Sequence, residues 1–167
     1  FKSVTKKIKE ESNKKVIDIY VEESPTGEIM AGAGTGSSGS SITAGIKEKN
    51  YLGKGINLNS SFTLRNDGLD ASVTRTDPNF KNTEKDLITN VRNSTTDALS
   101  RFGYKNRKTG FSFGTSYEQF EDIYFSPKLS VFQEKVTTSS KASAARKKQE
   151  GDFFETDFSY SFTLNRL

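Results

Sequence analysis

The sequence predicts an all-β protein built as an antiparallel meander, and three observations support this. Apolar and polar residues alternate with a period of two along most of the chain. Compact turn signals such as Asn66-Asp67-Gly68 separate the alternating runs. Helical periodicity is scarce, and the short Ala- and Lys-rich stretch 142–149 is the one candidate helix.

The clearest strand lies near the end of the chain. Phe158, Tyr160 and Phe162 alternate there with Ser159 and Ser161. Comparable alternation occurs at residues 42–47, 56–65, 69–74 and 111–118, with weaker contrast at 87–92 and 123–131. Strands in such close succession predict consecutive antiparallel pairs.

The composition excludes several classes of protein and site. The chain has 167 residues with no Cys and no His, so disulfide scaffolds, Cys/His zinc sites and Ser-His-Asp triads are excluded. It has no run of about 20 apolar residues and therefore no predicted membrane-spanning helix. The net charge of +4 is too small to indicate nucleic acid. The acidic residues lie around turns and the Gly-rich segment 32–39 lacks a P-loop ending, so we expect no enzyme, cofactor or metal.

The predicted connections differ between the two ends of the strands, which form two opposite edges of the sheet. Every second turn carries an aromatic residue, namely Tyr51, Phe80 or Phe120, so these residues should share one edge. The opposite edge should receive a short turn at Ser37–Ser40 and longer loops at 94–108 and 137–152. This asymmetry, with polar faces rich in Ser, Thr, Asn and Asp, is typical of an outer-membrane β-barrel. A soluble β domain is the alternative that the pattern leaves open.

Two segments carry a resemblance to a known family. The first is the Gly-rich stretch 32–39 followed by Asn50-Tyr51-Leu52-Gly53-Lys54-Gly55, and the second is residues 73–80, which end in Asp77-Pro78-Asn79-Phe80. In this order they resemble the start of the barrel of the BamA family of outer-membrane protein assembly factors. Residues 157–167 resemble the eighth strand of that barrel.

The resemblance implies a domain organisation. Residues 1–25 would be the C-terminal part of a periplasmic POTRA domain, and residues 26–167 would be the N-terminal half of a sixteen-stranded transmembrane barrel. We therefore expect a segment of a longer protein of the bacterial outer membrane, with its N-terminal part in the periplasm. The implied strands are residues 28–36, 41–50, 56–65, 69–76, 86–93, 110–118, 123–136 and 153–165.

The resemblance also implies a function without catalysis. Such a protein folds and inserts β-barrel proteins into the outer membrane through a lateral gate. Its expected partners are unfolded outer-membrane proteins, accessory assembly lipoproteins and outer-membrane lipid, with no nucleic acid and no cofactor. The alternatives are a related POTRA-barrel protein for autotransporter assembly or two-partner secretion, a passive porin, and a soluble β domain with a binding role.

The first barrel strand is the candidate functional site. Gly in a strand removes packing and costs entropy, so an edge rich in Gly should pair weakly and open easily. An open edge is a template for another strand. An accommodation of strand twist is the competing explanation. The predicted gate residues are Ile29, Ala31, Gly32, Ala33, Gly34, Thr35 and Gly36. The turn motifs contribute Asn50, Tyr51, Leu52, Gly53, Gly55, Asp77, Pro78 and Phe80.

Three further groups of side chains have candidate roles. Tyr51, Phe80, Phe120 and Tyr124 would form an interfacial aromatic girdle. The side chains expected to face lipid are Phe111, Phe113, Phe154, Phe158 and Phe162. A basic loop with Lys141, Arg146, Lys147 and Lys148 would either contact lipopolysaccharide phosphates or remain solvated. The segment Lys6–Lys15 is expected to be an exposed hairpin.

Overall fold

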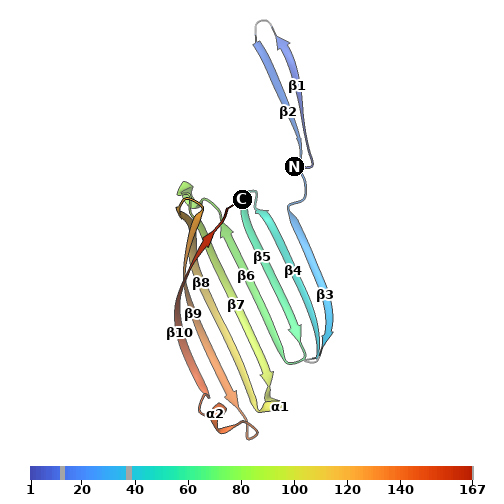
Figure 1. Ribbon diagram of the computed structural model, residues 1–167. Helices are drawn as coiled ribbons and strands as arrows, with labels where there is room; N and C mark the ends of the chain where they lie inside the picture. Colours follow the sequence, from blue (N-terminus) through green and yellow to red (C-terminus); the bar gives the residue numbers. More distant parts are fainter. Residues whose placement is uncertain (12–13, 37–38, 167) are drawn as a thin grey trace.

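The protein folds into two antiparallel sheets joined by a short linker (Figure 1). The computed structural model describes residues 1–11, 14–36 and 39–166. A two-stranded sheet pairs β1 (Ser3–Glu11) with β2 (Lys14–Glu22). The second sheet has eight strands in sequence order: β3 (Gly27–Gly36), β4 (Gly39–Tyr51), β5 (Ile56–Arg65), β6 (Gly68–Asp77), β7 (Asp86–Ala98), β8 (Tyr104–Phe120), β9 (Ile123–Thr138) and β10 (Gly151–Leu164). This confirms the predicted all-β antiparallel meander of eight strands.

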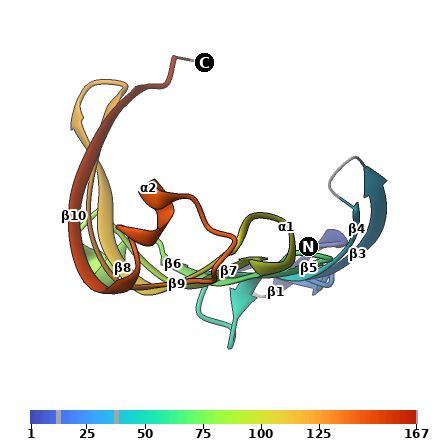
Figure 2. The same ribbon diagram turned by 90° about the horizontal axis from the view of Figure 1, so that it is seen from below.

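The large sheet is curved along its width. Seen from below in Figure 2, both end strands, β3 and β10, turn toward the same side, and this concave side also holds the helix α2 (Ala144–Lys147). The sheet is therefore shaped like an open half of a barrel. Neither described α-helix is long and apolar enough to cross a membrane.

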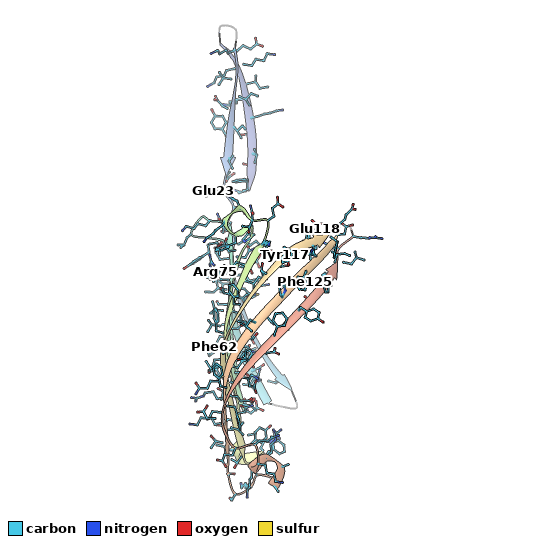
Figure 3. All side chains as sticks on the ribbon, turned by 90° about the vertical axis from the view of Figure 1, so that its left-hand side faces the viewer. Glu23, Phe62, Arg75, Tyr117, Glu118 and Phe125 are labelled. Atoms are coloured by element: carbon cyan, nitrogen blue, oxygen red, sulfur yellow. The ribbon has the colours of Figure 1, made fainter. Side chains whose placement is uncertain are left out.

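The pairing register separates apolar from polar side chains. Residues directly opposite each other on antiparallel strands point to the same face. Val73, Val91, Phe111 and Val131 are successive partners across β6 to β9, and they share one face. Tyr104 contacts Arg146 of α2, which lies on the concave side. Tyr104 is an even-numbered residue of β8 and Phe111 an odd-numbered one, so their side chains point to opposite faces. The apolar face is therefore the convex one. In Figure 3 the labelled Phe62 lies on this convex side.

The apolar face has no second layer packed on it. Ile56, Ala98 and Ala142 are the buried apolar residues of the described chain, whereas Phe154 is 76% and Phe158 65% exposed. A single sheet cannot cover its own apolar face, so these side chains face the surroundings. An exposed apolar surface of this extent indicates contact with another apolar medium.

Hydroxyl groups and ion pairs connect neighbouring strands on the concave face. Serine hydroxyls bond in cross-strand pairs, Ser112 with Ser130 at 2.9 Å and Ser116 with Ser126 at 2.8 Å. Charged side chains also pair on this face, as Arg65 with Asp70 and Lys108 with Glu155. The lining of the concave face is therefore polar and largely paired within itself.

One predicted connection is wrong. Residues 94–108 do not form a long loop, because β7 continues to Ala98, β8 begins at Tyr104 and the four-residue helix α1 (Leu99–Phe102) joins them. The extra strand residues are polar on both faces, which hides the period of two. Cross-strand bonds hold them, including Lys105 to Asp97 at 2.7 Å.

Other predicted connections are confirmed or lie partly outside the described chain. The loop at 137–152 is present, since β9 ends at Thr138 and β10 begins at Gly151, and α2 lies within the predicted helical stretch. The predicted turn Ser37–Ser40 falls partly outside the described residues. The 3-10 helix η1 (Phe80–Asn82) occupies the turn between β6 and β7.

The N-terminal hairpin projects beyond the edge of the large sheet at which β3 begins (Figure 1). Its strands pair from Ser3 with Glu22 to Glu11 with Lys14, and Ile8, Ile17 and Ile19 are each more than half exposed. The exposed hairpin predicted for Lys6–Lys15 is thus observed in its described residues. Isolated two-stranded hairpins are marginal in water, so this one requires further packing partners.

The β5–β6 hairpin shows why a particular glycine is required. Arg65 pairs with Gly68 across a two-residue connection, as the sequence predicts. Gly68 has no positive φ, but a Cβ added to it would overlap the main-chain carbonyl of Thr95 on β7. The glycine therefore allows β6 and β7 to approach each other closely.

Gly68→Ala should lower the free energy of unfolding by about 1–3 kcal/mol, because the main chain of β7 must move. Gly32→Ala is the matched control, since an added Cβ there meets nothing within 4 Å. It should be neutral or stabilising by less than about 1 kcal/mol. Urea unfolding of the folded full-length protein measures both. Equal effects of the two substitutions would contradict this role for Gly68.

Candidate strand-pairing edge

β3 forms one edge of the large sheet along its whole length. It pairs with β4 from Gly27 opposite Glu48 to Gly36 opposite Gly39, and among the described residues no strand pairs with its other side. All ten of its residues are exposed. The predicted gate residues therefore lie together on one edge strand.

The hydrogen-bond pattern identifies which main-chain groups of β3 are unpaired. The Lys49 N–H donates to the Thr26 carbonyl at 3.2 Å, which makes these two residues a hydrogen-bonded pair in the β3–β4 register. Because such pairs alternate, even-numbered residues of β3 bond to β4 and odd-numbered residues point their N–H and C=O groups outward. The residues with outward groups are Gly27, Ile29, Ala31, Ala33 and Thr35.

The side chains of residues 31–36 of β3 are too small to contribute much packing. Gly32, Gly34 and Gly36 lie on the concave face, and an added Cβ at Gly32 or Gly36 would have no neighbour within 4 Å. Packing within the described chain therefore does not require Gly at these two positions. On the convex face Ala31 and Ala33 present single methyl groups, and Ile29 is 86% exposed. The backbone thus supplies most of what β3 offers to another strand.

The opposite edge, β10, differs from β3 in its side chains. Phe162 stacks on Phe125 of β9 with ring centroids 4.8 Å apart, and Tyr117 of β8 meets Phe125 edge-on at 5.9 Å. Figure 3 shows Tyr117 and Phe125 near the upper end of the sheet. Tyr160 of β10 also lies beside Phe125, with ring centroids 6.3 Å apart, so aromatic packing ties β10 to β9. β3 has no such side-chain support.

The apolar band of the convex face is longer on β10 than on β3. On β10 it runs from Phe154 to Leu164, which is about 33 Å along the strand and about 25 Å along the barrel axis at a tilt of about 40°. On β3 it runs from Ile29 to Ala33, about 13 Å along the strand and about 10 Å along the axis. The full band on β10 matches the height of a barrel's lipid-facing surface.

The predicted glycine turn adjoins the start of β3. Leu52, Gly53 and Gly55 all have positive φ, so this turn needs residues free to adopt that conformation. The Asn50 side-chain carbonyl accepts from the Gly55 N–H at 2.7 Å and closes the turn. Tyr51 ends β4 at the same edge.

The second turn motif lies two strands away, at the same end of the strands. Asp77 ends β6 and its carboxylate accepts from Arg75 at 2.6 Å. After Pro78, Asn79 has φ of 51° and its side-chain carbonyl accepts from the Glu84 N–H at 2.9 Å. The Phe80 N–H donates to the Lys85 carbonyl at 2.7 Å. None of the hydrogen bonds that close this turn involves β3.

The aromatic positions are confirmed in part. Tyr51, Phe80 and Phe120 lie at turns of the same edge. The register places Tyr124 opposite Glu118 and Thr163, on the concave face, so its prediction as part of an outward girdle is wrong. Tyr117, Phe125 and Tyr160 are aromatic residues of the convex face near this end of the strands that were not assigned to the girdle. Their place in the alternation of their own strands, close to a strand end, is the signal that could have assigned them.

Residues 1–11, 14–36 and 39–166 contain no cluster of side chains suited to bind a metal ion. Within them no three Asp or Glu side chains are grouped closely enough to hold a metal ion. What the β3 edge can do chemically is form main-chain hydrogen bonds with another strand.

Comparison with known proteins supports the fold. No family model matches the sequence, and no curated protein matches it significantly. The structure is similar to the crystal structure of BamA from Haemophilus ducreyi lacking POTRA domains 1-3, with a TM-score of 0.73 and 24% sequence identity. The match covers 97% of this chain and 34% of that one, so this chain spans about a third of its length. The large sheet therefore has a BamA-like barrel fold.

Asn50→Ala should destabilise the turn beside β3 by about 1 kcal/mol, because the Gly55 N–H loses its acceptor. Asn59→Ala on β5 is the control, because Asn59 is exposed and its side chain makes no hydrogen bond within the described chain. Hydrogen exchange of the Gly55 amide in the folded full-length protein reports the difference. Unchanged Gly55 protection in Asn50→Ala would show that the side chain does not close the turn.

Proposed function

We propose that this chain is the N-terminal half of the transmembrane barrel of an outer-membrane protein assembly factor. Residues 26–167 would form the first eight strands of a barrel of sixteen, and residues 1–25 would complete a periplasmic POTRA domain. The exposed β3 edge carries this proposal, because its residues 31–36 are small and it lacks a second neighbouring strand in the described chain. The BamA-like fold supports it.

The proposed membrane placement follows from the two faces of the sheet. The convex band would contact lipid, and the concave face with its paired serines and ion pairs would line the interior. The hairpin β1–β2 and the turns with Tyr51, Phe80 and Phe120 lie at the same end of the strands, and this end would face the periplasm. The helices α1 and α2 would then lie outside the cell.

The proposed mechanism is an exchange of main-chain hydrogen bonds. The outward N–H and C=O groups of Ile29, Ala31 and Ala33 would pair with the strand that closes the barrel, and then with a strand of an unfolded substrate. A hydrogen bond contributes about 0.5–1.5 kcal/mol net, so each exchange is nearly balanced. Residues 31–36 of β3 carry no large side chain, so little packing is lost there when the partner strand changes.

The narrow apolar band at β3 favours the same site. A short lipid-facing surface forces the adjacent bilayer to thin or to admit water, and either change lowers the barrier for a polar, partly paired strand to enter. The longer band on β10 would match a bilayer of normal thickness at that strand. The proposed partners are thus unfolded outer-membrane proteins and outer-membrane lipid, with assembly lipoproteins on the periplasmic side.

Sealing the β3 edge should abolish insertion of substrate. In the full-length protein, one Cys replaces Ala31 and a second is placed in the strand that closes the barrel against β3. This segment has no native Cys to interfere. Oxidation should lower the insertion of a test β-barrel protein into liposomes by at least about tenfold, and reduction should restore it. Retained insertion by the oxidised protein would exclude β3 as the gate.

The matched control joins β3 to β4 and leaves the outer edge free. Ala31→Cys with Ala44→Cys places two thiols directly opposite each other in the observed register. Oxidation of this pair should leave insertion unchanged. A loss of activity here as well would indicate a requirement for mobility of β3 and not for its free edge.

Phe158→Arg should cost about 2–4 kcal/mol in folding into lipid, because the proposed placement puts Phe158 in the middle of the apolar band. Ser161→Arg is the control on the same strand, since Ser161 lies on the concave face opposite Ser126. Refolding of the full-length variants into phosphatidylcholine vesicles, followed by urea titration, measures both. Equal costs would contradict the assignment of the convex face to lipid.

A further inference from the structure

Two like charges face each other on the convex surface of β8 and β9. Arg107 and Lys135 are direct cross-strand partners, and both side chains are exposed. Their parity is that of Phe111 and Val131, so they point outward from the sheet. Like charges directly opposite each other on a sheet are destabilising unless an anion offsets them.

The acidic groups beside this pair have other partners. Asp97 on β7 accepts from Lys105 at 2.7 Å, and Asp152, which lies opposite Lys135, accepts from Gln133 at 3.1 Å. Neither Arg107 nor Lys135 has an ion-pair partner within the described chain. Lys105 lies on the same face, and its charge is offset by Asp97. The pair Arg107 and Lys135 therefore has unused capacity for an anion.

The pair lies just beyond one end of the apolar band. Arg107 is four residues from Phe111 along β8, which is about 10 Å along the barrel axis at a tilt of about 40°. On β10 the band ends toward this side at Phe154, which lies opposite Gln133. Lys135 is the next residue of β9 on the same face. In the proposed placement, this is the depth of the headgroups of the outer leaflet.

We infer that Arg107 and Lys135 form a site for a phosphate group of an outer-leaflet lipid. A guanidinium and an ammonium together match the charge of a phosphate and can donate several charge-assisted hydrogen bonds to it. The apolar band directly below them would hold the acyl chains of the same lipid. A free phosphate ion would lack this second contact. The inference rests on the proposed placement in the outer membrane.

This site differs from the basic loop predicted from the sequence. In that loop Arg146 lies 4.5 Å from the ring of Tyr104 and also donates to Gln149 at 3.0 Å, and α2 sits on the concave side of the sheet. Lys141 donates to the Ser100 carbonyl at 3.4 Å. These cations are held within the molecule on the side away from the proposed lipid contact.

The test uses full-length protein folded in neutral detergent, with diphosphorylated lipid A as the probe. The wild-type protein should show a higher unfolding temperature with this lipid and should retain it through purification. Arg107→Gln combined with Lys135→Gln should reduce the retained lipid about tenfold and remove the rise in unfolding temperature. In detergent alone each single substitution should raise the unfolding temperature, because it relieves the repulsion between the two cations.

Lys128→Gln is the matched control, since Lys128 is an exposed cation of the same strand that points to the concave face. It should leave lipid retention unchanged. Dephosphorylated lipid A and millimolar inorganic phosphate should each fail to raise the unfolding temperature. Equal retention by wild-type and double variant, or an equal effect of inorganic phosphate, would overturn the site. Failure of the membrane placement would be recognised separately, as tolerance of Phe158→Arg.

Discussion

The ladder of main-chain hydrogen bonds between consecutive antiparallel strands is the interaction on which the rest of this structure depends. Few side chains are buried, and the apolar ones among the described residues that are, Ile56, Ala98 and Ala142, are scattered and not grouped in a core. Stability therefore comes from pairing along the strands and from side chains that match one medium on each face. A ladder of this kind leaves main-chain groups unpaired at its two outer strands alone. The edges are consequently where a chemical function based on pairing can reside.

The two edges of the large sheet have opposite characters because of their side chains. β10 is held by rings such as Phe125 and Phe162, whereas β3 contributes glycines and alanines that add little to the pairing of its main chain. Both strands expose the same kind of N–H and C=O groups. In the proposed function, this difference in side-chain support would make exchange of the neighbouring strand less costly at β3.

The sequence predicts the sheet well because most strands have one apolar and one polar face, and this produces a period of two. The prediction failed at residues 94–108, where Asn106 and Lys108 on one face alternate with Lys105 and Arg107 on the other. With polar side chains on both faces, no periodicity marks the strand, although the main chain continues to pair. Tyr124 was assigned to the wrong face for a related reason. Tyr124 was placed in the girdle because it lies close to a turn. The face to which it points is decided by its odd or even position within β9.

The site at β3 could be located from composition, but its geometry could not. Six small residues in a predicted strand indicate weak packing, yet the sequence does not tell which main-chain groups are already bonded to β4. That distinction needed one bond, from the Lys49 N–H to the Thr26 carbonyl, which sets the alternation for the whole strand. The opposition of Arg107 and Lys135 has the same origin, because the residues are 28 apart in sequence and meet only through the β8–β9 register. In the large sheet, the register between strands therefore decides which residues lie together in a site.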